Sequence, residues 1–327
     1  MEDFGAIEDD YITEDKISNI DNQIYQACQC EPTWFLKSIP KEINELINIK
    51  FAADYFYLKK DYVEAIKLYQ TYLDDNINMS ITCRRECFEG ISRSYMFLRC
   101  YCHAYKYAMK HYNSASTMDT YTASLTLLYD VSLVTKMLRD SLIYAKKLVS
   151  LHILNSDIWL KLAFAYSRYY NILVLHIPSQ FPQSLISLNS LCEAKNIPLP
   201  CECSNESETI VNEKSIIHVI TSLLYAEYHL KSTMNSAIGF SFENNVKLQE
   251  KINKELDEYS LSDSIINNLR ENIKQLFAGV KNDDYDSSDD FIDRASSKFT
   301  NAEVVKCILK DFDESEFDRK WFSFTCI

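Results

Sequence analysis

The spacing of side-chain sizes between Trp159 and Tyr166 constrains this chain more than any other feature. Trp159 is followed by Leu162, Ala163 and Tyr166, and these offsets place the four side chains on one face of a helix. Alanine leaves room for a second helix to approach closely, while the large residues fill the space beside it. The pattern therefore predicts one helix of a packed helical pair.

Three helical pairs with a related size pattern precede this helix. Ala65 and Ala104 take the small position in the first two pairs and lie 39 residues apart, and Ser141 follows Ala104 by 37 residues. Such periods are typical of tetratricopeptide-like repeats of about 34 residues. We therefore expect an all-α, tetratricopeptide-like helical-repeat solenoid, an α–α superhelix with a C-terminal helical cap. The residues expected to hold this fold are Ala53, Ala65, Ser92, Ala104, Trp159, Leu162, Ala163 and Tyr166.

Composition argues against several other classes of protein. Only four glycines occur in 327 residues, and no glycine-rich phosphate loop or nucleophile elbow is present. We therefore expect no enzyme activity and no cofactor.

The start of the chain lacks a signal peptide's basic and apolar regions, and no apolar run is long enough for a membrane span. We expect an intracellular protein of the cytoplasm, the nucleus or both, with reduced thiols and no membrane contact.

The sequence divides into segments of different character. We expect an acidic flexible arm over 1–29, helical repeats over 30–177 and a long loop containing proline and cysteine over 178–210. Further helices are expected over 211–280, followed by an acidic linker over 281–290 and an acidic, aromatic tail over 291–327.

Three islands of sequence carry a resemblance to a known family. They are Cys30-Glu-Pro-x-Trp34-Phe35, the stretch from Leu148 to His152 that leads to Trp159, and Glu316-Phe-x-x-Lys-Trp-Phe322. In these islands the chain resembles an animal family whose human member is named only as a chromosome 8 open reading frame. The resemblance implies a tetratricopeptide-like helical fold and brings no catalytic or binding residue.

A repeat stack predicts binding to a protein. Repeat offsets place Asp54, Tyr57, Arg93 and Tyr95 on the expected groove, and we interpret the chain as a non-enzymatic scaffold or adaptor that binds a peptide or helix of a partner. The partner's identity stays open. Grooves that hold chaperone C-terminal tails need Lys, Asn and Arg at set offsets. Here these offsets hold Asp54, Gly90, Ala123 and Leu127, so chaperone tails are not expected.

A row of cations is predicted on one helix face by Arg99, His103, Lys106 and Lys110. The preferred interpretation is a solvated outer face, and the alternative is a dock for an acidic peptide or the chain's own acidic arm. The net charge is -13, although residues 51–171 carry 15 Lys and Arg against 11 Asp and Glu, giving +4. That balance leaves an RNA-contacting helical-repeat protein as the second hypothesis for function, because non-specific affinity for nucleic acid depends on cations.

Two further features have a structural and a functional interpretation. Cys28, Cys30, Cys201 and Cys203 could supply four thiolates to one zinc ion, but ordinary buried cysteines are the preferred interpretation and no metal is expected. Phe317, Trp321 and Phe322 form an apolar face near the C-terminus. We expect this tail anchor to pack on its own domain, and the alternative is a detachable helix for a partner's groove.

Overall fold

The computed structural model describes residues 33–36, 46–75, 79–172, 213–234, 236–259, 261–280, 305 and 308–325. Within these ranges every regular element is a helix, and none is a strand, which confirms the all-α fold. The chain divides into two compact units, residues 1–39 and 40–327. In the first unit the structure describes a 3-10 turn, η2 (Trp34–Leu36).

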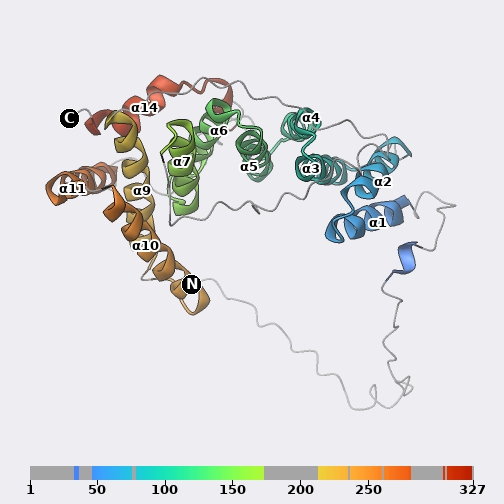
Figure 1. Cartoon of the computed structure of the whole chain (residues 1–327), viewed down its shortest axis with the longest axis horizontal. Coiled ribbons are helices and arrows are strands. Elements are labelled where there is room, and N and C mark those ends of the chain that lie inside the picture. Colours follow the sequence, from blue (N-terminus) through green and yellow to red (C-terminus); the bar gives the residue numbers. More distant parts are fainter. Residues whose placement is uncertain are drawn as a thin grey trace, which may run out of the picture. The chain divides into compact units, whose positions relative to one another are not determined.

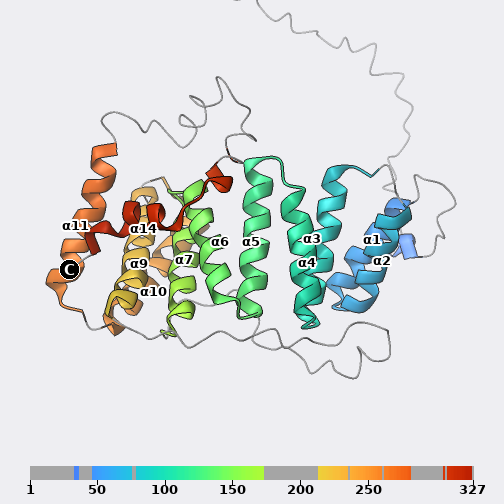
Figure 2. The same ribbon diagram turned by 90° about the horizontal axis from the view of Figure 1, so that it is seen from above.

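Helices of the second unit follow each other in helical pairs. Their bounds are α1 (Leu46–Leu58), α2 (Tyr62–Asp75), α3 (Ile81–Phe97), α4 (Tyr101–Asn113), α5 (Met118–Val134), α6 (Leu138–Leu151) and α7 (Ser156–Tyr169). Each helix packs against the next one in the chain, and Figure 2 shows them standing side by side in sequence order. This array of neighbouring helices confirms the helical-repeat solenoid. We call α1, α3, α5 and α7 the first helices, and α2, α4 and α6 the second helices.

The same backbone turn closes every first helix. A residue with positive φ follows two positions after each of these helices: Lys60, Arg99, Lys136 and Asn171. The next residue's N–H then bonds back to a carbonyl five positions earlier, as from Asp61 to Phe56 at 2.9 Å and from Met137 to Ser132 at 2.9 Å. This hydrogen bond is typical of the Schellman motif at the C-terminus of a helix, in which glycine usually occupies the left-handed position. Here the left-handed position is filled by longer side chains, so the repeat uses no glycine for its turns.

Two apolar clusters fill the second unit and meet at α5. The α1–α5 core combines aliphatic side chains and tyrosines with small residues that include Ala53, Ala65 and Ala104, all fully buried. Tyr69 of α2 crosses Gly90 of α3 so closely that a Cβ on the glycine would lie 2.6 Å from the tyrosine ring. The close approach of α2 and α3 therefore depends on glycine, which has no side chain, at position 90.

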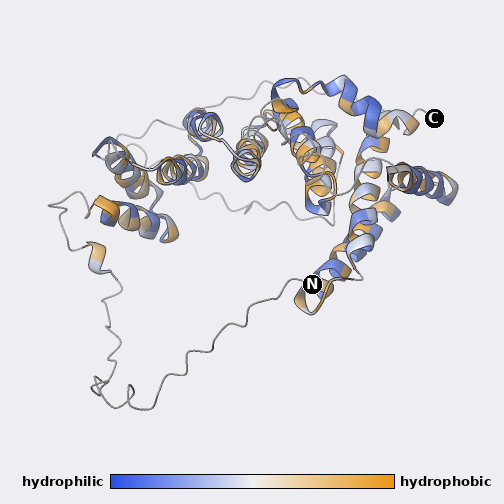
Figure 3. Ribbon diagram, turned by 180° about the vertical axis from the view of Figure 1, so that it is seen from behind, coloured by the Kyte–Doolittle hydropathy of each residue, from blue (hydrophilic) through white to orange (hydrophobic). Residues whose placement is uncertain are grey.

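The second cluster, which we call the α5–α14 core, joins α5–α7 to later helices. These are α9 (Glu213–Thr233), α10 (Phe240–Glu258), α11 (Asp263–Val280), α14 (Glu314–Phe322) and η4 (Ser323–Thr325). Helix α9 packs on α7, and α10 and α11 pack on α9 (Figure 1). Arg270 of α11 donates to Glu227 of α9 at 3.0 Å. Figure 3 shows hydrophobic and hydrophilic residues on the same helices, as expected for helices with one packed and one exposed side.

Candidate interaction surfaces

Polar side chains connect the first helices to one another. Lys50 of α1 bonds to Asp54 one turn later at 3.0 Å and reaches Glu86 of α3 at 2.9 Å. Asp54 also accepts a 2.6 Å hydrogen bond from the Tyr69 hydroxyl. Burial alone would lower the pKa of Lys50, but its bonds to Glu86 and Asp54 raise that pKa above the ordinary value. The ammonium group is therefore charged and held between two helices.

The same arrangement continues along the stack. Arg93 of α3 pairs with Glu89 at 2.9 Å and with Asp130 of α5 at 3.4 Å. Burial raises the pKa of Asp130, and the Arg93 charge opposes this rise. Between α5 and α7, the Tyr129 hydroxyl donates to the Lys161 carbonyl at 3.0 Å, and the Lys161 ammonium lies 5.5 Å from the Tyr129 ring centre. Each pair of neighbouring first helices is thus bridged by a polar contact.

We name the surface formed by Lys50, Asp54, Glu86, Glu89, Arg93 and Asp130 the first-helix face. Its two cations are largely covered, with 13% of the Lys50 side chain and 28% of the Arg93 side chain exposed, and the Asp130 carboxylate is covered as well, at 10%. Among the carboxylates, Glu86 is 52% and Asp54 is 41% exposed. The surface therefore presents mainly carboxylates to solvent, a charge that suits a cationic partner.

The groove residues expected from repeat offsets fall into two groups. Asp54 and Arg93 belong to the first-helix face, and Tyr57 is half-buried beside Tyr62 and Phe97, with ring centres 5.7 and 6.4 Å away. Tyr95 does not join them. Its side chain is 5% exposed and packs towards α4, near the rings of His103 and Tyr107, because it occupies the opposite side of α3. The expected offset was wrong for this residue.

The expected basic row is shorter than four residues. Arg99 lies in the left-handed turn before α4, at the position equivalent to Lys60 and Lys136, so it cannot share a helix face with the others. His103, Lys106 and Lys110 lie on α4, where both lysines are exposed. The row therefore occupies a second helix, whereas the carboxylates of the first-helix face lie on first helices.

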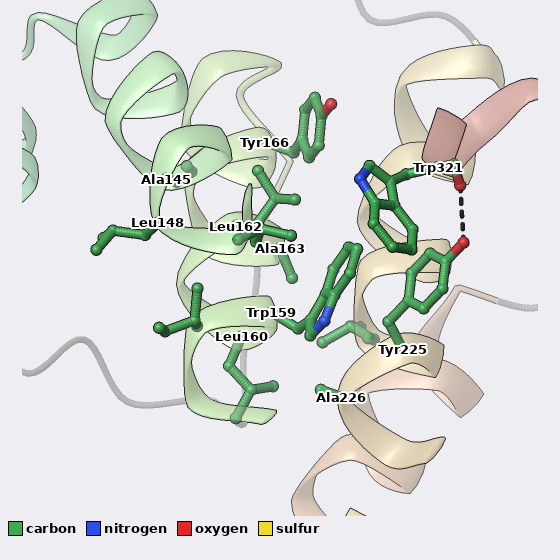
Figure 4. Packing of buried hydrophobic residues seen from close by; sticks show 14 of the residues in the cluster. Ala145, Leu148, Trp159, Leu160, Leu162, Ala163, Tyr166, Tyr225, Ala226 and Trp321 are labelled. Atoms are coloured by element: carbon green, nitrogen blue, oxygen red, sulfur yellow. Dashed lines mark hydrogen bonds between the residues drawn. The ribbon is translucent and has the colours of Figure 1, made fainter. Parts of the chain in front are cut away.

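The C-terminal helix α14 packs on the repeats through the tail anchor. Phe317, Trp321 and Phe322 are each no more than 4% exposed. The ring of Trp321 meets Trp159 edge-on at 5.5 Å, and the Trp321 carbonyl accepts a 2.9 Å hydrogen bond from Tyr225 (Figure 4). Trp159 itself stacks on Tyr225 with ring centres 4.1 Å apart. In this structure the anchor is thus part of its own domain's core.

An ion pair and a tyrosine fix α14 further. The Lys146 side chain of α6 is 4% exposed, and its ammonium lies 2.9 Å from Asp318 and 3.7 Å from Glu314. The Tyr166 hydroxyl donates to Oδ1 of the same Asp318 carboxylate at 3.2 Å. Beneath them, burial lowers the pKa of His218, whose ring stacks on Tyr166 at 5.1 Å. A buried cation on the repeats thus recognises a carboxylate of the last helix.

Beside α14 lies a cavity of about 330 Å³. Its walls are mostly apolar, including Leu151, Ile153 and Phe312, while Asp311 and Glu316 line it with carboxylates. The repeats and the C-terminal segment contribute to these walls together. The cavity therefore exists only while α14 is docked.

The zinc candidates Cys28, Cys30, Cys201 and Cys203 lie outside the described residues. Across the part of the chain that the structure describes, no cluster of His, Cys, Asp and Glu is arranged to hold a metal ion. Cys83 and Cys87 of α3 are free thiols. None of the helices in the described ranges is both long and apolar enough to cross a membrane.

Sequence reasoning missed the residues that join distant helices. Lys146 stands in an ordinary helical stretch, and its partner Asp318 lies 172 residues later. Repeat offsets identify Gly90 only as a mismatch to a chaperone-tail site, whereas in the structure its missing side chain makes room for the Tyr69 ring. A glycine inside an amphipathic helix is the signal that could have found this close approach.

Comparisons with known proteins identify the family of this chain. Residues 4–184 match the model described as "Family of unknown function (DUF5588)". The human protein named "Uncharacterized protein C8orf76" is 23% identical over 91% of this chain and 86% of its own length. Its rat counterpart, named "Uncharacterized protein C8orf76 homolog", is 29% identical, and that match covers 43% of this chain and 38% of the rat protein. No solved structure matches. These relatives confirm the resemblance carried by the three sequence islands.

Proposed function

Since this chain belongs to the family of unknown function DUF5588, whose description assigns no activity, we propose a function from its own surfaces. The protein is a non-enzymatic interaction scaffold, and its first-helix face binds a basic peptide or helix of a partner protein. The observation that carries this proposal is the unequal exposure of opposite charges on that face. Cations are covered between helices, whereas Glu86, Asp54 and Glu89 reach solvent.

The construction of the face supports a binding role. Its cations are already fixed by carboxylates of the same chain, so little ordering is required of them when a partner arrives. A basic partner would find carboxylates from two neighbouring first helices, Asp54 on α1 with Glu86 and Glu89 on α3. Such charge complementarity favours specificity and fast association, and salt weakens it. Tyr57 of α1 and Phe97 of α3 add aromatic surface on the same two helices, with ring centres 6.4 Å apart.

Contact with RNA remains the second hypothesis for function, and it draws on different residues. The cations that would neutralise phosphates, Lys106 and Lys110, lie on α4 and not on the first-helix face. An RNA partner would therefore bind a second-helix surface with a steep dependence on salt. The two hypotheses thus predict effects from different substitutions.

The test is a selection of peptides from a random-sequence display library on the immobilised full-length protein. We expect the recovered peptides to be rich in Lys and Arg. Their affinity, measured by fluorescence polarisation, should fall about tenfold in Glu86→Lys, because this reverses the most exposed charge of the face. Glu86 is half-exposed, so this variant should keep its fold by circular dichroism.

The matched control is Glu64→Lys on α2. It makes the same charge change at a partly exposed glutamate, which pairs with Lys67 on a second helix. Affinity in this variant should stay within about twofold of the unchanged protein. Recovery of neutral or acidic peptides, or equal losses in both variants, would contradict the proposal. RNA crosslinked in cells, with no peptide recovered, would favour the second hypothesis.

A further inference from the structure

A hollow with a different charge lies between α2, α3 and α4. It encloses about 430 Å³ and is lined by Gln70, Leu73, Asp74, Arg84, Phe88, Tyr107 and Lys110. Helix α3 directs Arg84 and Phe88 into this hollow, whereas its residues Glu86, Glu89 and Arg93 form the first-helix face. We name it the α2–α4 pocket. It is separate from the proposed binding face, although both use α3.

The cations of this pocket differ from those of the first-helix face. Lys50 and Arg93 are each held by two carboxylates. In contrast, neither Arg84 nor Lys110 forms an ion pair with any residue in the described part of the chain. The one carboxylate among the lining residues is Asp74, which is exposed at the end of α2. Two cations thus face one hollow without a carboxylate of their own.

The pocket walls hold these groups in place. The Lys110 ammonium lies 4.5 Å from the centre of the Tyr107 ring and 5.7 Å from that of Phe88. Gln70 donates to the Tyr107 hydroxyl at 3.2 Å, which fixes this ring from α2. Cation–π contact positions Lys110 but leaves its charge uncompensated by any anion.

We propose that the α2–α4 pocket binds a carboxylate side chain of an acidic peptide segment from a partner protein. Arg84 offers a planar set of donors to the carboxylate, and Lys110 offers a point charge beside it. Lys106 is exposed one turn before Lys110 on α4 and would attract a neighbouring acidic residue of the same peptide. The protein thus carries two docking sites of opposite charge preference on the same repeats.

The aromatic residues favour a peptide over RNA. Single-stranded RNA is bound by stacking its bases on free aromatic faces. The Tyr107 ring is already engaged by Lys110, by Gln70 and by Tyr95, whose ring stacks at 6.0 Å. Phe88 lies against Tyr107 with ring centres 6.2 Å apart. Without a free ring to stack on, a base gains little here, while a carboxylate needs only the cations.

The test uses a fluorescein-labelled twelve-residue peptide rich in Glu, a second peptide with Gln at every Glu, and oligouridine of the same length. Polarisation titrations on the full-length protein should show binding of the Glu peptide only. Arg84→Gln and Lys110→Met should each weaken this binding about tenfold. Asp74→Asn should strengthen it about threefold, because it removes the carboxylate that competes for the cations. Lys247→Gln on α10 changes an exposed lysine elsewhere and should have no effect.

Several results would overturn the proposal. Equal binding of the Gln peptide, or an equal loss in Lys247→Gln, would mean that the pocket cations do not select the ligand. Oligouridine binding that depends on Arg84 and Lys110 would assign the pocket to RNA instead. Glu86→Lys should leave the Glu peptide's affinity unreduced, because Glu86 belongs to the first-helix face and not to this pocket. The proposals for the two sites can therefore be refuted independently of each other. Thermal melts on each variant show whether the fold is kept, and Asp74→Asn tests the site by a gain that unfolding cannot produce.

Discussion

The two cores of the second unit are held together in different ways. The α1–α5 core brings helices close through alanine, serine and glycine, and joins neighbouring first helices by polar contacts at its edge. The α5–α14 core is organised around large aromatic side chains, with Trp159 between Tyr225 and Trp321. The first core is assembled from residues near in sequence, whereas the second joins residues as distant as Trp159 and Trp321.

This difference shows where each core is vulnerable. In the α1–α5 core, an added atom is more harmful than a removed one, because helix approach depends on small side chains. In the α5–α14 core, removal of one large ring leaves a void that neighbouring helices cannot fill. The charge arrangement differs as well, since only 4% of the Lys146 side chain in the α5–α14 core is exposed, whereas Lys50 and Arg93 beside the first core keep 13% and 28% of their side chains exposed.

The largest effect is expected from Trp159→Ala in the α5–α14 core. This ring is fully buried, stacks on Tyr225 and donates from Nε1 to the Ile153 carbonyl at 2.7 Å. Its loss should lower the free energy of unfolding by about 3 to 5 kcal/mol, measured by urea denaturation. Trp34→Ala is the control, because 46% of that tryptophan is exposed. The control should change stability by less than about 0.5 kcal/mol. Equal effects at the two sites would show that Trp159 does not anchor this core.

The sequence predicted the repeat helices better than the contacts made by the C-terminal helices. Offsets from Ala53 to Tyr166 predict helix pairs, because residues that pack within a repeat stand at short, regular spacings. The left-handed turns at Lys60, Arg99 and Lys136 are not predictable in this way, since glycine normally marks such positions. The contact of Trp321 with Trp159 depends on where a distant helix returns, and no local spacing encodes that.

The residues of the candidate sites were likewise predicted only in part. Repeat offsets predict one shared surface for Asp54 and Arg93, and both lie on the first-helix face, whereas Tyr95 and Arg99 lie elsewhere because one helix side or one turn decides their position. The sequence did not predict which charged side chains of the first-helix face are covered and which reach solvent. This depends on which helix covers each cation, and sequence spacing carries no information on that exposure.

The next effect concerns the ion pair between α6 and α14. Asp318→Ala would leave the buried Lys146 ammonium with only Glu314, 3.7 Å away, and should cost about 3 kcal/mol. Lys146→Met should cost about 1 kcal/mol or less, because the remaining Asp318 is 40% exposed and can be hydrated. The double variant should be more stable than Asp318→Ala alone. Chemical denaturation of all three variants measures this order, and a larger loss in Lys146→Met would show that the buried charge is not the sensitive partner.

A smaller effect tests the close approach in the α1–α5 core. Gly90→Ala would normally favour a helix by about 1 kcal/mol, but the new Cβ would meet the Tyr69 ring. Tyr69 is 3% exposed and bonds to Asp54, so it has little room to move. We expect a net loss of about 1 to 3 kcal/mol in the free energy of unfolding.

Tyr69→Phe provides the second variant of a double-mutant cycle with Gly90→Ala. It removes the hydroxyl that lies 2.9 Å from the Cβ position and its hydrogen bond to Asp54. The two losses should be less than additive, because both act on the same contact. A gain in stability from Gly90→Ala alone would mean that the helices can separate without cost.

The smallest effect comes from the repeated turn, and it should increase stability. Lys136 is exposed and has a φ of 60°, a left-handed conformation that a residue with Cβ adopts at a cost of about 1 kcal/mol. Lys136→Gly should therefore raise the free energy of unfolding by about 1 kcal/mol, whereas Lys254→Gly, an exposed site inside α10, should lower it by a similar amount. Thermal unfolding of both variants compares one substitution in two backbone conformations. A loss of stability in both variants would mean that the Lys136 side chain stabilises its turn despite the strained backbone. A gain in Lys136→Gly with a loss in Lys254→Gly would show that glycine stabilises this left-handed turn, although the repeats do not use glycine there.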